Sequence, residues 1–426
     1  MIMKTEVIIT NIKHLLRKLT KTGFFHIFGS SVLNKILSFM CSIVVVRIVS
    51  KISFGEYTYA NNIVSLILLF SGLGMVSGTF QLCSEEVNNK IKQEEIYRYG
   101  CSIGSFFNLF LAILILIISL IVKFKIEGAN VLIRLMAFYP LIMILFEFQQ
   151  VYLRSTLENR KYSYSTTINT VLIVVFSILG SVLFEVKGLI FGTYLAYILS
   201  VLILSMHFRV PILLKKKKLD ATVKKLLYRI SIVSMCNNGL SQLLYLVDIF
   251  IMGIILPNES IIASYKIATV IPTAMAFIPS AIVTYIYPYF AMNRDDKEWT
   301  YQHYILLLKS MLIINICISL LLIIFSSKLI SLIYGDVYLD AVPCFRVLVI
   351  SYLFSGTFRI ISGNLLVTQR KVEFNLFVAI ISGIINIIGN LILIPKYGSM
   401  GAAIVTLIVV VVSSLISTTY YIKLIK

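Results

Sequence analysis

Apolar stretches long enough to cross a bilayer follow one another almost end to end along the 426 residues. A transmembrane helix needs about 20 mainly apolar residues, and only helices and closed barrels satisfy their backbone hydrogen bonds in lipid. Charged residues make up 13% of the chain, whereas a soluble protein carries about 25%. The sequence predicts an all-α polytopic membrane protein with 12 transmembrane helices, at residues 24–46, 57–82, 99–122, 131–153, 166–184, 188–210, 230–256, 263–291, 304–325, 343–367, 374–394 and 400–422.

The basic residues are distributed unevenly between the two sides of the predicted membrane. Of the 38 Lys and Arg, 25 fall in the termini and even-numbered loops, 8 fall in the odd-numbered loops, and 5 lie inside or at the edge of spans. Because Lys and Arg accumulate in cytoplasmic loops, this bias predicts that both termini are cytoplasmic. It also accounts for the net charge of +19 without a nucleic-acid partner.

One long polar break, rich in lysine, divides the spans into two sets of six. We predict an N-terminal bundle at 24–210, a basic cytoplasmic linker at 211–229 and a C-terminal bundle at 230–426. Residues 1–23 are basic, with apolar residues spaced as on one face of a helix. They form either an amphipathic helix on the cytoplasmic surface or a disordered tail.

The two halves carry related motifs at a nearly constant offset. Arg160-Lys161 and Gly188 recur 210 residues later, and the Tyr57–Ala60 motif recurs 208 residues later as Tyr265–Ala268. Because each half has an even number of spans, both have the same orientation. The sequence therefore predicts two six-helix bundles related by a pseudo-two-fold axis along the membrane normal.

Five charged residues fall inside predicted spans: Lys35, Glu147, Asp248, Lys309 and Arg359. A charge at the centre of a lipid-facing helix costs about 2.5–3.5 kcal/mol on insertion scales, so these side chains are expected to face a polar interior. Arg346, Arg47 and Lys266 lie near predicted span ends and are interpreted as interface anchors.

Polar residues extend two of these charged positions into stripes along one helix face. Lys35 lies in a stripe with Ser31, Ser38 and Ser42, and Asp248 lies in a stripe with Ser234, Asn238, Ser241 and Tyr245. Asn386 and Asn390 are four residues apart on the eleventh span. Hydrogen bonding between helices explains Ser and Asn alone, but the charges favour a water-filled cavity.

Motifs for catalysis, metal binding and ATP hydrolysis were not found. The sequence has no phosphate-binding glycine loop, its six cysteines form no CxxC pair, and its four histidines lack metal-ligand spacing. We therefore expect no enzyme activity, metal or cofactor, and an ion gradient or the substrate gradient as the source of energy.

Several motifs in order resemble the bacterial polysaccharide (O-antigen) flippases of the multidrug/oligosaccharidyl-lipid/polysaccharide exporter superfamily. Asn390-Leu-Ile-Leu-Ile-Pro-Lys-Tyr-Gly398 leads through Gly401-Ala-Ala into the last span. Phe54-Gly55-Glu56-Tyr57, Leu332-Ile-Tyr-Gly335 and Thr368-Gln-Arg-Lys371 also match, and the resemblance covers nearly the whole chain.

This resemblance implies a function. Such proteins move undecaprenyl-diphosphate-linked oligosaccharide repeat units from the cytoplasmic to the periplasmic leaflet of the inner membrane, for O-antigen or capsule synthesis, by alternating access through a central cavity. Lys35, Lys309 and Arg359 are then expected to pair with the diphosphate, and Asn238 and Asn386 to contribute neutral contacts. Glu147 and Asp248 are either structural partners of these cations or ligands of a coupling ion, H+ or Na+. The implied partners are the lipid-linked oligosaccharide, membrane lipids, and the polysaccharide polymerase and chain-length machinery.

Two alternatives remain open at this point. A cation-coupled small-molecule exporter of the same superfamily would favour acidic cavity residues, which the cationic spans argue against. A polysaccharide polymerase or ligase would be an enzyme with a large periplasmic loop, whereas the longest loop here is basic and predicted to be cytoplasmic.

Overall fold

The computed structural model describes residues 24–211 and 217–426, and every regular element within them is a helix. The predicted N-terminal segment and part of the lysine-rich linker lie outside the described residues. In chain order the first half contains α2 (Phe24–Ile48), α3 (Lys51–Leu68), η1 (Ser71–Gly74), α4 (Met75–Glu85), α5 (Lys90–Ile121), α6 (Ala129–Leu135), α7 (Tyr139–Ser155) and α8 (Asn159–His207).

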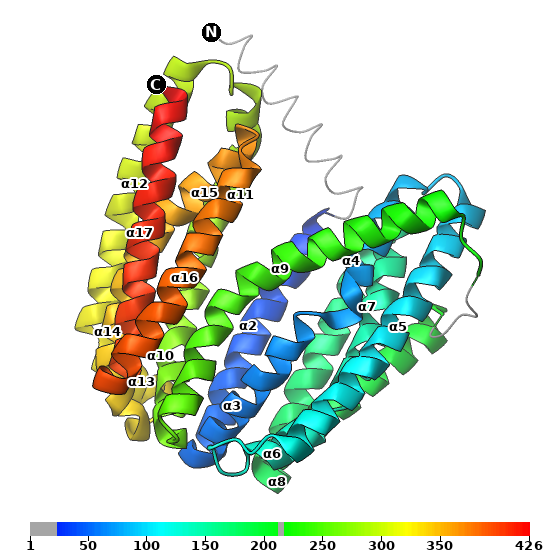
Figure 1. The fold of residues 1–426 in the computed structure, drawn as a ribbon, viewed down its shortest axis with the longest axis horizontal. Helices are drawn as coiled ribbons and strands as arrows, with labels where there is room; N and C mark the ends of the chain where they lie inside the picture. The colour runs from blue at the N-terminus through cyan, green and yellow to red at the C-terminus, as the bar shows by residue number, and fades with distance from the viewer. Residues whose placement is uncertain (1–23, 212–216) are drawn as a thin grey trace. The chain divides into compact units, whose positions relative to one another are not determined.

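The second half begins with the long helix that follows the linker. It contains α9 (Ala221–Ile255), α10 (Glu259–Met275), α11 (Phe277–Met292), α12 (Lys297–Ile324), α13 (Ser326–Tyr334), η2 (Asp336–Ala341), α14 (Val342–Phe354), η3 (Ser355–Arg359), α15 (Ile360–Thr368), α16 (Val372–Tyr397) and α17 (Ser399–Ile425) (Figure 1).

The helices of the described residues account for the 12 predicted spans. Nine are long and apolar enough to cross a membrane, and the bent pair α6 and α7 makes a tenth. The 49-residue helix α8 has non-helical backbone at Phe184 and Glu185, so it divides into two spans. Counting α9 as well gives twelve, and the predicted all-α polytopic fold is confirmed.

By contacts, the chain forms two compact units. The first comprises the chain up to Ser50 together with Val64–Lys123 and Asn130–Gly239, and the second comprises Lys51–Ile63, Phe124–Ala129 and Leu240–Lys426. The predicted bundles, 24–210 and 230–426, were defined by their position in the sequence, and these boundaries stay a prediction.

In the first unit, glycines allow α4 to approach α9 closely. A Cβ atom at Gly74 would lie 2.1 Å from the Ser231 carbonyl oxygen, and one at Gly78 would lie 2.1 Å from Ser231 Oγ. Gly74 also has a positive φ of 71°, which favours glycine. Gly74 and Gly78 are four residues apart, a GxxxG spacing that is typical of close helix packing in membranes.

The second unit includes the start of α3. Lys51 Nζ lies 2.8 Å from Asp340 Oδ1, and Asn62 Nδ2 donates to the Leu246 carbonyl oxygen over 3.1 Å. A Cβ atom at Gly55 would lie 2.0 Å from the Glu259 carbonyl oxygen, so only glycine permits this approach. The Phe54-Gly55 motif therefore fixes the start of α3 against α10.

The core of this unit is built on α17. It packs against α16 and α14, while α10 packs on α14 and α11 on α15 (Figure 1). A Cβ atom at Gly401 would lie 2.3 Å from the Leu393 carbonyl oxygen, so small residues at the start of α17 permit the close approach of α16. This packing brings polar residues of α9, α10, α16 and α17 together.

Candidate functional site

A carboxylate is buried in the second unit with a complete set of hydrogen-bond donors. Asp248 on α9 is 6% exposed. Its Oδ1 accepts from Asn386 Nδ2 at 2.9 Å and Asn390 Nδ2 at 2.7 Å, and its Oδ2 accepts from Tyr265 OH and Thr406 Oγ1, each at 2.9 Å. An ionised carboxylate has about four lone-pair sites, so four donors match its charged form.

The local sequence explains why these donors meet. Asn386 and Asn390 are one helical turn apart, so both amides lie on one face of α16. The close packing of α16 on α17 brings Thr406 to the same point, and Tyr265 reaches it from α10. Asn390 Oδ1 is buried and has no hydrogen-bond partner among the described residues, so it is an oxygen that an ion could bind beside the carboxylate.

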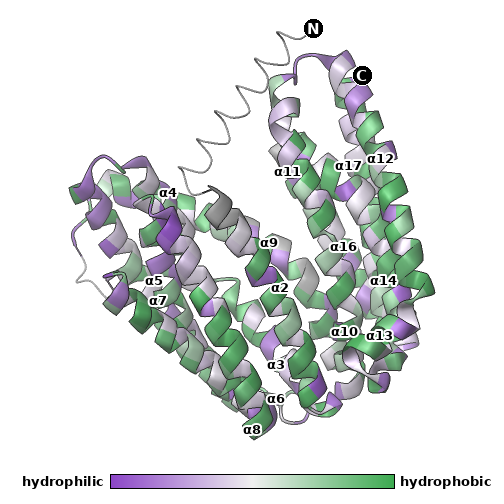
Figure 2. Ribbon diagram, turned by 180° about the vertical axis from the view of Figure 1, so that it is seen from behind, coloured by the Kyte–Doolittle hydropathy of each residue, from purple (hydrophilic) through white to green (hydrophobic). Residues whose placement is uncertain are grey.

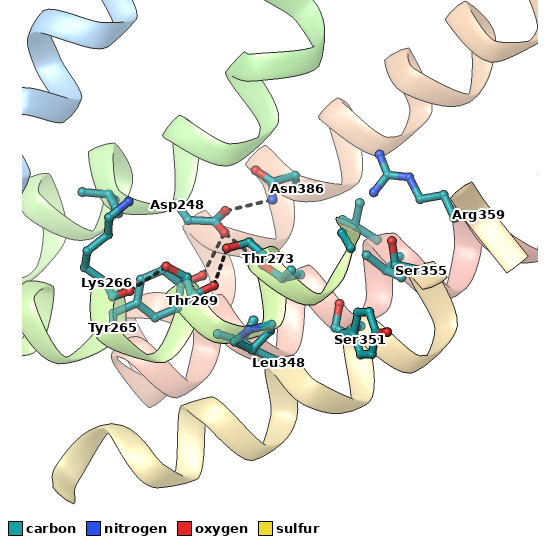
Figure 3. A pocket seen from close by; sticks show the side chains of 17 residues that line it. Asp248, Tyr265, Lys266, Thr269, Thr273, Leu348, Ser351, Ser355, Arg359 and Asn386 are labelled. Carbon is teal, nitrogen blue, oxygen red and sulfur yellow. Dashed lines mark hydrogen bonds between the residues drawn. The ribbon is translucent and has the colours of Figure 1, made fainter. Parts of the chain in front are cut away.

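Asp248 lies on the wall of a cavity of about 490 Å³. The other lining residues with polar side chains are Tyr265, Lys266, Thr269, Thr273, Ser351, Tyr352, Ser355, Arg359, Asn386 and Thr406. Figure 3 shows Lys266 and Arg359 on opposite sides of Asp248. Among the described residues neither cation forms an ion pair. The cavity is therefore lined by two basic side chains and one acidic side chain.

A short π-helix carries Arg359 to this cavity. The segment η3 follows α14, whose Leu348, Ser351 and Tyr352 line the same wall. The fully buried Asn315 of α12 supports the turn, because it accepts from Tyr352 OH at 2.8 Å and donates to Thr357 Oγ1 over 3.1 Å. Single π-turns within helices are frequent at functional sites.

The structure brings together three of the residues expected from sequence: Asp248, Asn386 and Arg359. Lys309 is exposed on α12 and is not among the residues that line this cavity. Lys35 on α2 and Asn238 on α9 are exposed and belong to the first unit. The side chains of Ser241 and Tyr245, expected in the stripe with Asp248, lie outside the described ones.

Glu147, the other expected acidic residue, belongs to a different unit from Asp248. It is half-buried on α7 in the first unit and forms no ion pair with a described residue. Of the two acidic residues, Asp248 is therefore the one with a complete set of hydrogen-bond donors.

Sequence reasoning missed several polar residues of the site, among them Lys266 and Thr406. Lys266, interpreted as an interface anchor, lines the cavity, and Thr406 donates to Asp248. The repeated Tyr265–Ala268 motif contains Lys266 and could have indicated it. Thr406 carries no signal of its own, because only the packing of α17 on α16 places it beside the carboxylate.

Solved structures show where else this fold occurs. A multidrug resistance MATE family transporter of the MOP superfamily, in an inward-facing conformation, has a TM-score of 0.74 at 16% identity, covering 92% of this chain and 94% of that one. The lipid II flippase MurJ, in an inward closed conformation, has a TM-score of 0.73 at 17% identity, covering 92% of this chain and 87% of that one. No curated protein sequence matches the chain.

These similarities show that the chain has the same fold as these two membrane proteins. A family model described as "Polysaccharide biosynthesis protein" matches residues 44–343, which is more than half of the sequence. The chain belongs to this family of polysaccharide biosynthesis proteins.

Proposed function

We propose that this protein flips undecaprenyl-diphosphate-linked oligosaccharide repeat units from the cytoplasmic to the periplasmic leaflet, for O-antigen or capsule synthesis. The observation that carries the proposal is the cavity with Lys266 and Arg359, two cations without ion-pair partners among the described residues. A diphosphate presents several anionic oxygens, and charge-assisted hydrogen bonds to such oxygens are about twice as strong as neutral ones.

The proposal assigns each part of the substrate to a different environment. The diphosphate pairs with Lys266 and Arg359, the saccharide stays in the water-filled interior, and the polyprenyl tail stays in lipid. Lys35, Lys309 and Asn238 remain proposed contacts that the substrate meets elsewhere on its path. The family membership supports a role in polysaccharide synthesis, and the similarity of fold to MurJ supports a flipping mechanism.

Asp248 is the proposed site of ion coupling. Its carboxylate and the unpartnered Asn390 Oδ1 are oxygen ligands of the kind that Na+ takes, and the carboxylate alone is sufficient for H+. Either ion would change the hydrogen bonds that hold α9, α10, α16 and α17 together. Glu147 remains a second candidate in the first unit.

A cation-coupled small-molecule exporter is the alternative function. The buried Asp248 favours it, as do the apolar residues of the cavity wall, Ile249, Leu348, Val409 and Val410. Such an exporter has no need for Lys266 and Arg359, because cationic drugs would be repelled by them. Resistance to cationic drugs on overexpression, unchanged when both cations are replaced by alanine, would favour the exporter.

The proposed orientation rests on the uneven distribution of Lys and Arg, and it has both termini in the cytoplasm. The proposed membrane is the bacterial inner membrane, where the substrate is made. The polymerase and the chain-length machinery that consume the flipped repeat unit are proposed partners.

Complementation tests the proposal. A bacterial strain that lacks its own flippase and shares the repeat unit is given this gene, and the lipid-linked repeat unit is quantified on each leaflet. We expect periplasmic repeat units and surface polysaccharide with the wild type, and accumulation on the cytoplasmic leaflet with the Lys266→Ala/Arg359→Ala pair. Lys328→Ala removes an exposed cation of α13, away from the cavity, and should behave as the wild type. Full surface polysaccharide in the double variant would refute the cationic site.

A further inference from the structure

One helix of the second unit has an exposed face unlike those of its neighbours. On α11 the exposed residues are spaced along a single face and include Ser280, Thr284, Tyr285, Pro288 and Tyr289, together with the apolar Phe277 and Met292. On α12 the large exposed hydrophobic residues are Leu306, Ile313, Ile314, Ile316, Leu320, Leu321 and Ile324, and the polar Lys309 and Ser310 are also exposed. On α16 the large exposed hydrophobic residues are Leu376, Phe377, Ile380, Ile384, Ile387, Ile388, Leu391, Ile392 and Tyr397. In Figure 2, α12 is largely green where α11 is paler.

This difference indicates different surroundings. Contact with lipid tails favours aliphatic side chains, as along most of α12 and of α16, and gives no reason to keep a row of hydroxyl groups. Hydroxyl groups and tyrosines on α11 instead fit a surface that meets a ligand with both apolar and polar groups.

Two tyrosines form the aromatic part of the face. Tyr285 is 71% exposed and Tyr289 is 50% exposed, and they lie one helical turn apart. Their ring centroids are 5.8 Å apart, with the planes at 51° to each other. Aromatic faces carry negative charge density and attract the slightly positive C–H bonds that a sugar ring presents on its apolar side.

The hydroxyl groups on the same span can accept hydrogen bonds. Ser280 Oγ donates to the Ala276 carbonyl oxygen at 2.7 Å, and Thr284 Oγ1 donates to the Ser280 carbonyl oxygen at 2.8 Å. With the proton so used, each hydroxyl oxygen still has lone pairs for an outside donor. Sugar hydroxyl groups are such donors.

The span that carries this face also lines the cavity that contains Asp248, through its first half, α10. Lys266, Thr269, Thr273 and Ala276 line that cavity from α10, and α11 begins at the next residue, Phe277. One span therefore carries a cation at the cavity and an aromatic and hydroxyl face beyond it. This order matches a lipid-linked oligosaccharide, in which the saccharide is attached directly to the diphosphate.

We propose that Tyr285 and Tyr289, with Ser280 and Thr284, form a saccharide-binding surface next to the cationic cavity. The inference rests on the proposed flippase function, because it assigns the sugar part of that substrate to this face. Stacking uses C–H bonds common to pyranose rings, so the surface contributes to affinity for many sugars and does not by itself select one.

Two ligands separate the saccharide site from the diphosphate site. The full-length protein, purified in detergent, is titrated with lipid-linked oligosaccharide extracted from the cells that make it, and separately with undecaprenyl diphosphate. We expect Tyr285→Leu/Tyr289→Leu to weaken binding of the glycosylated lipid by about threefold to tenfold per ring, with no change for the bare diphosphate. Tyr285→Phe/Tyr289→Phe keeps the rings and should stay near the wild type, as should Tyr397→Leu, which removes an exposed tyrosine of α16.

The outcomes distinguish this inference from the proposed function. Equal weakening of both ligands by the leucine pair, or no weakening, would overturn the saccharide surface. A lower yield of folded protein with both the leucine and phenylalanine pairs would identify the tyrosines as membrane-interface anchors and also overturn it. If the wild type binds the bare and the glycosylated lipid no better than a phospholipid, the proposed function itself fails.

Discussion

At the scale of single residues, Asp248 shows how this fold tolerates a charge in a membrane-spanning helix. An isolated buried carboxylate would cost much free energy. Here the two oxygens each accept two side-chain hydrogen bonds, and the four donors come from three other helices. Removing one donor leaves part of the carboxylate without a hydrogen bond. The contribution of each donor to the free energy of unfolding can therefore be measured separately.

Thr406 offers the cleanest test of that network. Thr406→Val has nearly the same shape but no hydroxyl group, so the hydrogen bond to Asp248 Oδ2 is lost. We expect the free energy of unfolding to fall by about 1–2 kcal/mol, as measured by reversible unfolding in detergent micelles. This range lies between the values known for hydrogen bonds between membrane helices and for hydrogen bonds to charged groups. Thr406→Ser keeps the hydroxyl group and serves as the control. Equal stability of the valine and serine variants would show that the bond contributes nothing.

The sequence could predict only part of the site at this scale. Asp248, Asn386 and Arg359 are visible because charge and amide groups are unusual in apolar spans. Lys266 is ambiguous, because a lysine near a span end also has the simpler explanation of snorkelling to the interface. Thr406 could not be predicted, since threonine is common in membrane helices and its partner lies 158 positions away in the chain.

At the scale of helices, glycine spacing determines how closely segments approach. In the first unit Gly78 faces Ser231 and Leu227 of α9, whose nearest atoms would lie 2.1 Å and 3.2 Å from an added Cβ. The sequence contains the pattern for this contact, because Gly74 and Gly78 have the GxxxG spacing that is typical of close helix packing.

Enlarging this glycine should separate α4 from α9. For Gly78→Leu we expect a loss of about 1–3 kcal/mol from overpacking, seen as a lower unfolding midpoint and less monodisperse protein on size-exclusion chromatography. Gly29→Leu on α2 is the matched control, since an added Cβ there meets nothing within 4 Å. A wild-type midpoint for Gly78→Leu would mean that the α4–α9 contact can be rebuilt at no cost.

The boundaries of helices were harder to predict than their number. The predicted fifth and sixth spans agree with the two halves of α8, which separate at Phe184 and Glu185. These halves pack closely, because a Cβ atom at Gly180 would lie 2.1 Å from the Gly188 carbonyl oxygen. In contrast, α3 begins before its predicted span, at Lys51, where the pairing of Lys51 with Asp340 extends it. Such tertiary contacts cannot be inferred from local hydropathy.

At the scale of the whole molecule, twelve spans and the basic loops predict a single topology. Reporter enzymes that are active only in the periplasm, fused after Lys426 or within residues 293–296, should be inactive, whereas a fusion at residues 256–258 should be active. Activity at the C-terminus would reverse the predicted orientation and with it the direction of transport.

We propose that the cavity of the second unit binds a lipid-linked diphosphate during flipping. Purified protein in liposomes, loaded with extracted lipid-linked oligosaccharide on one leaflet, allows the rate of its appearance on the other leaflet to be measured directly. For Lys266→Ala and Arg359→Ala we expect each rate at subsaturating substrate to fall roughly tenfold to a hundredfold, because each loses a charge-assisted hydrogen bond worth about 1.5–3 kcal/mol. Lys328→Ala should flip at the wild-type rate. A wild-type flipping rate in the variants that lack Lys266 or Arg359 would contradict this proposal.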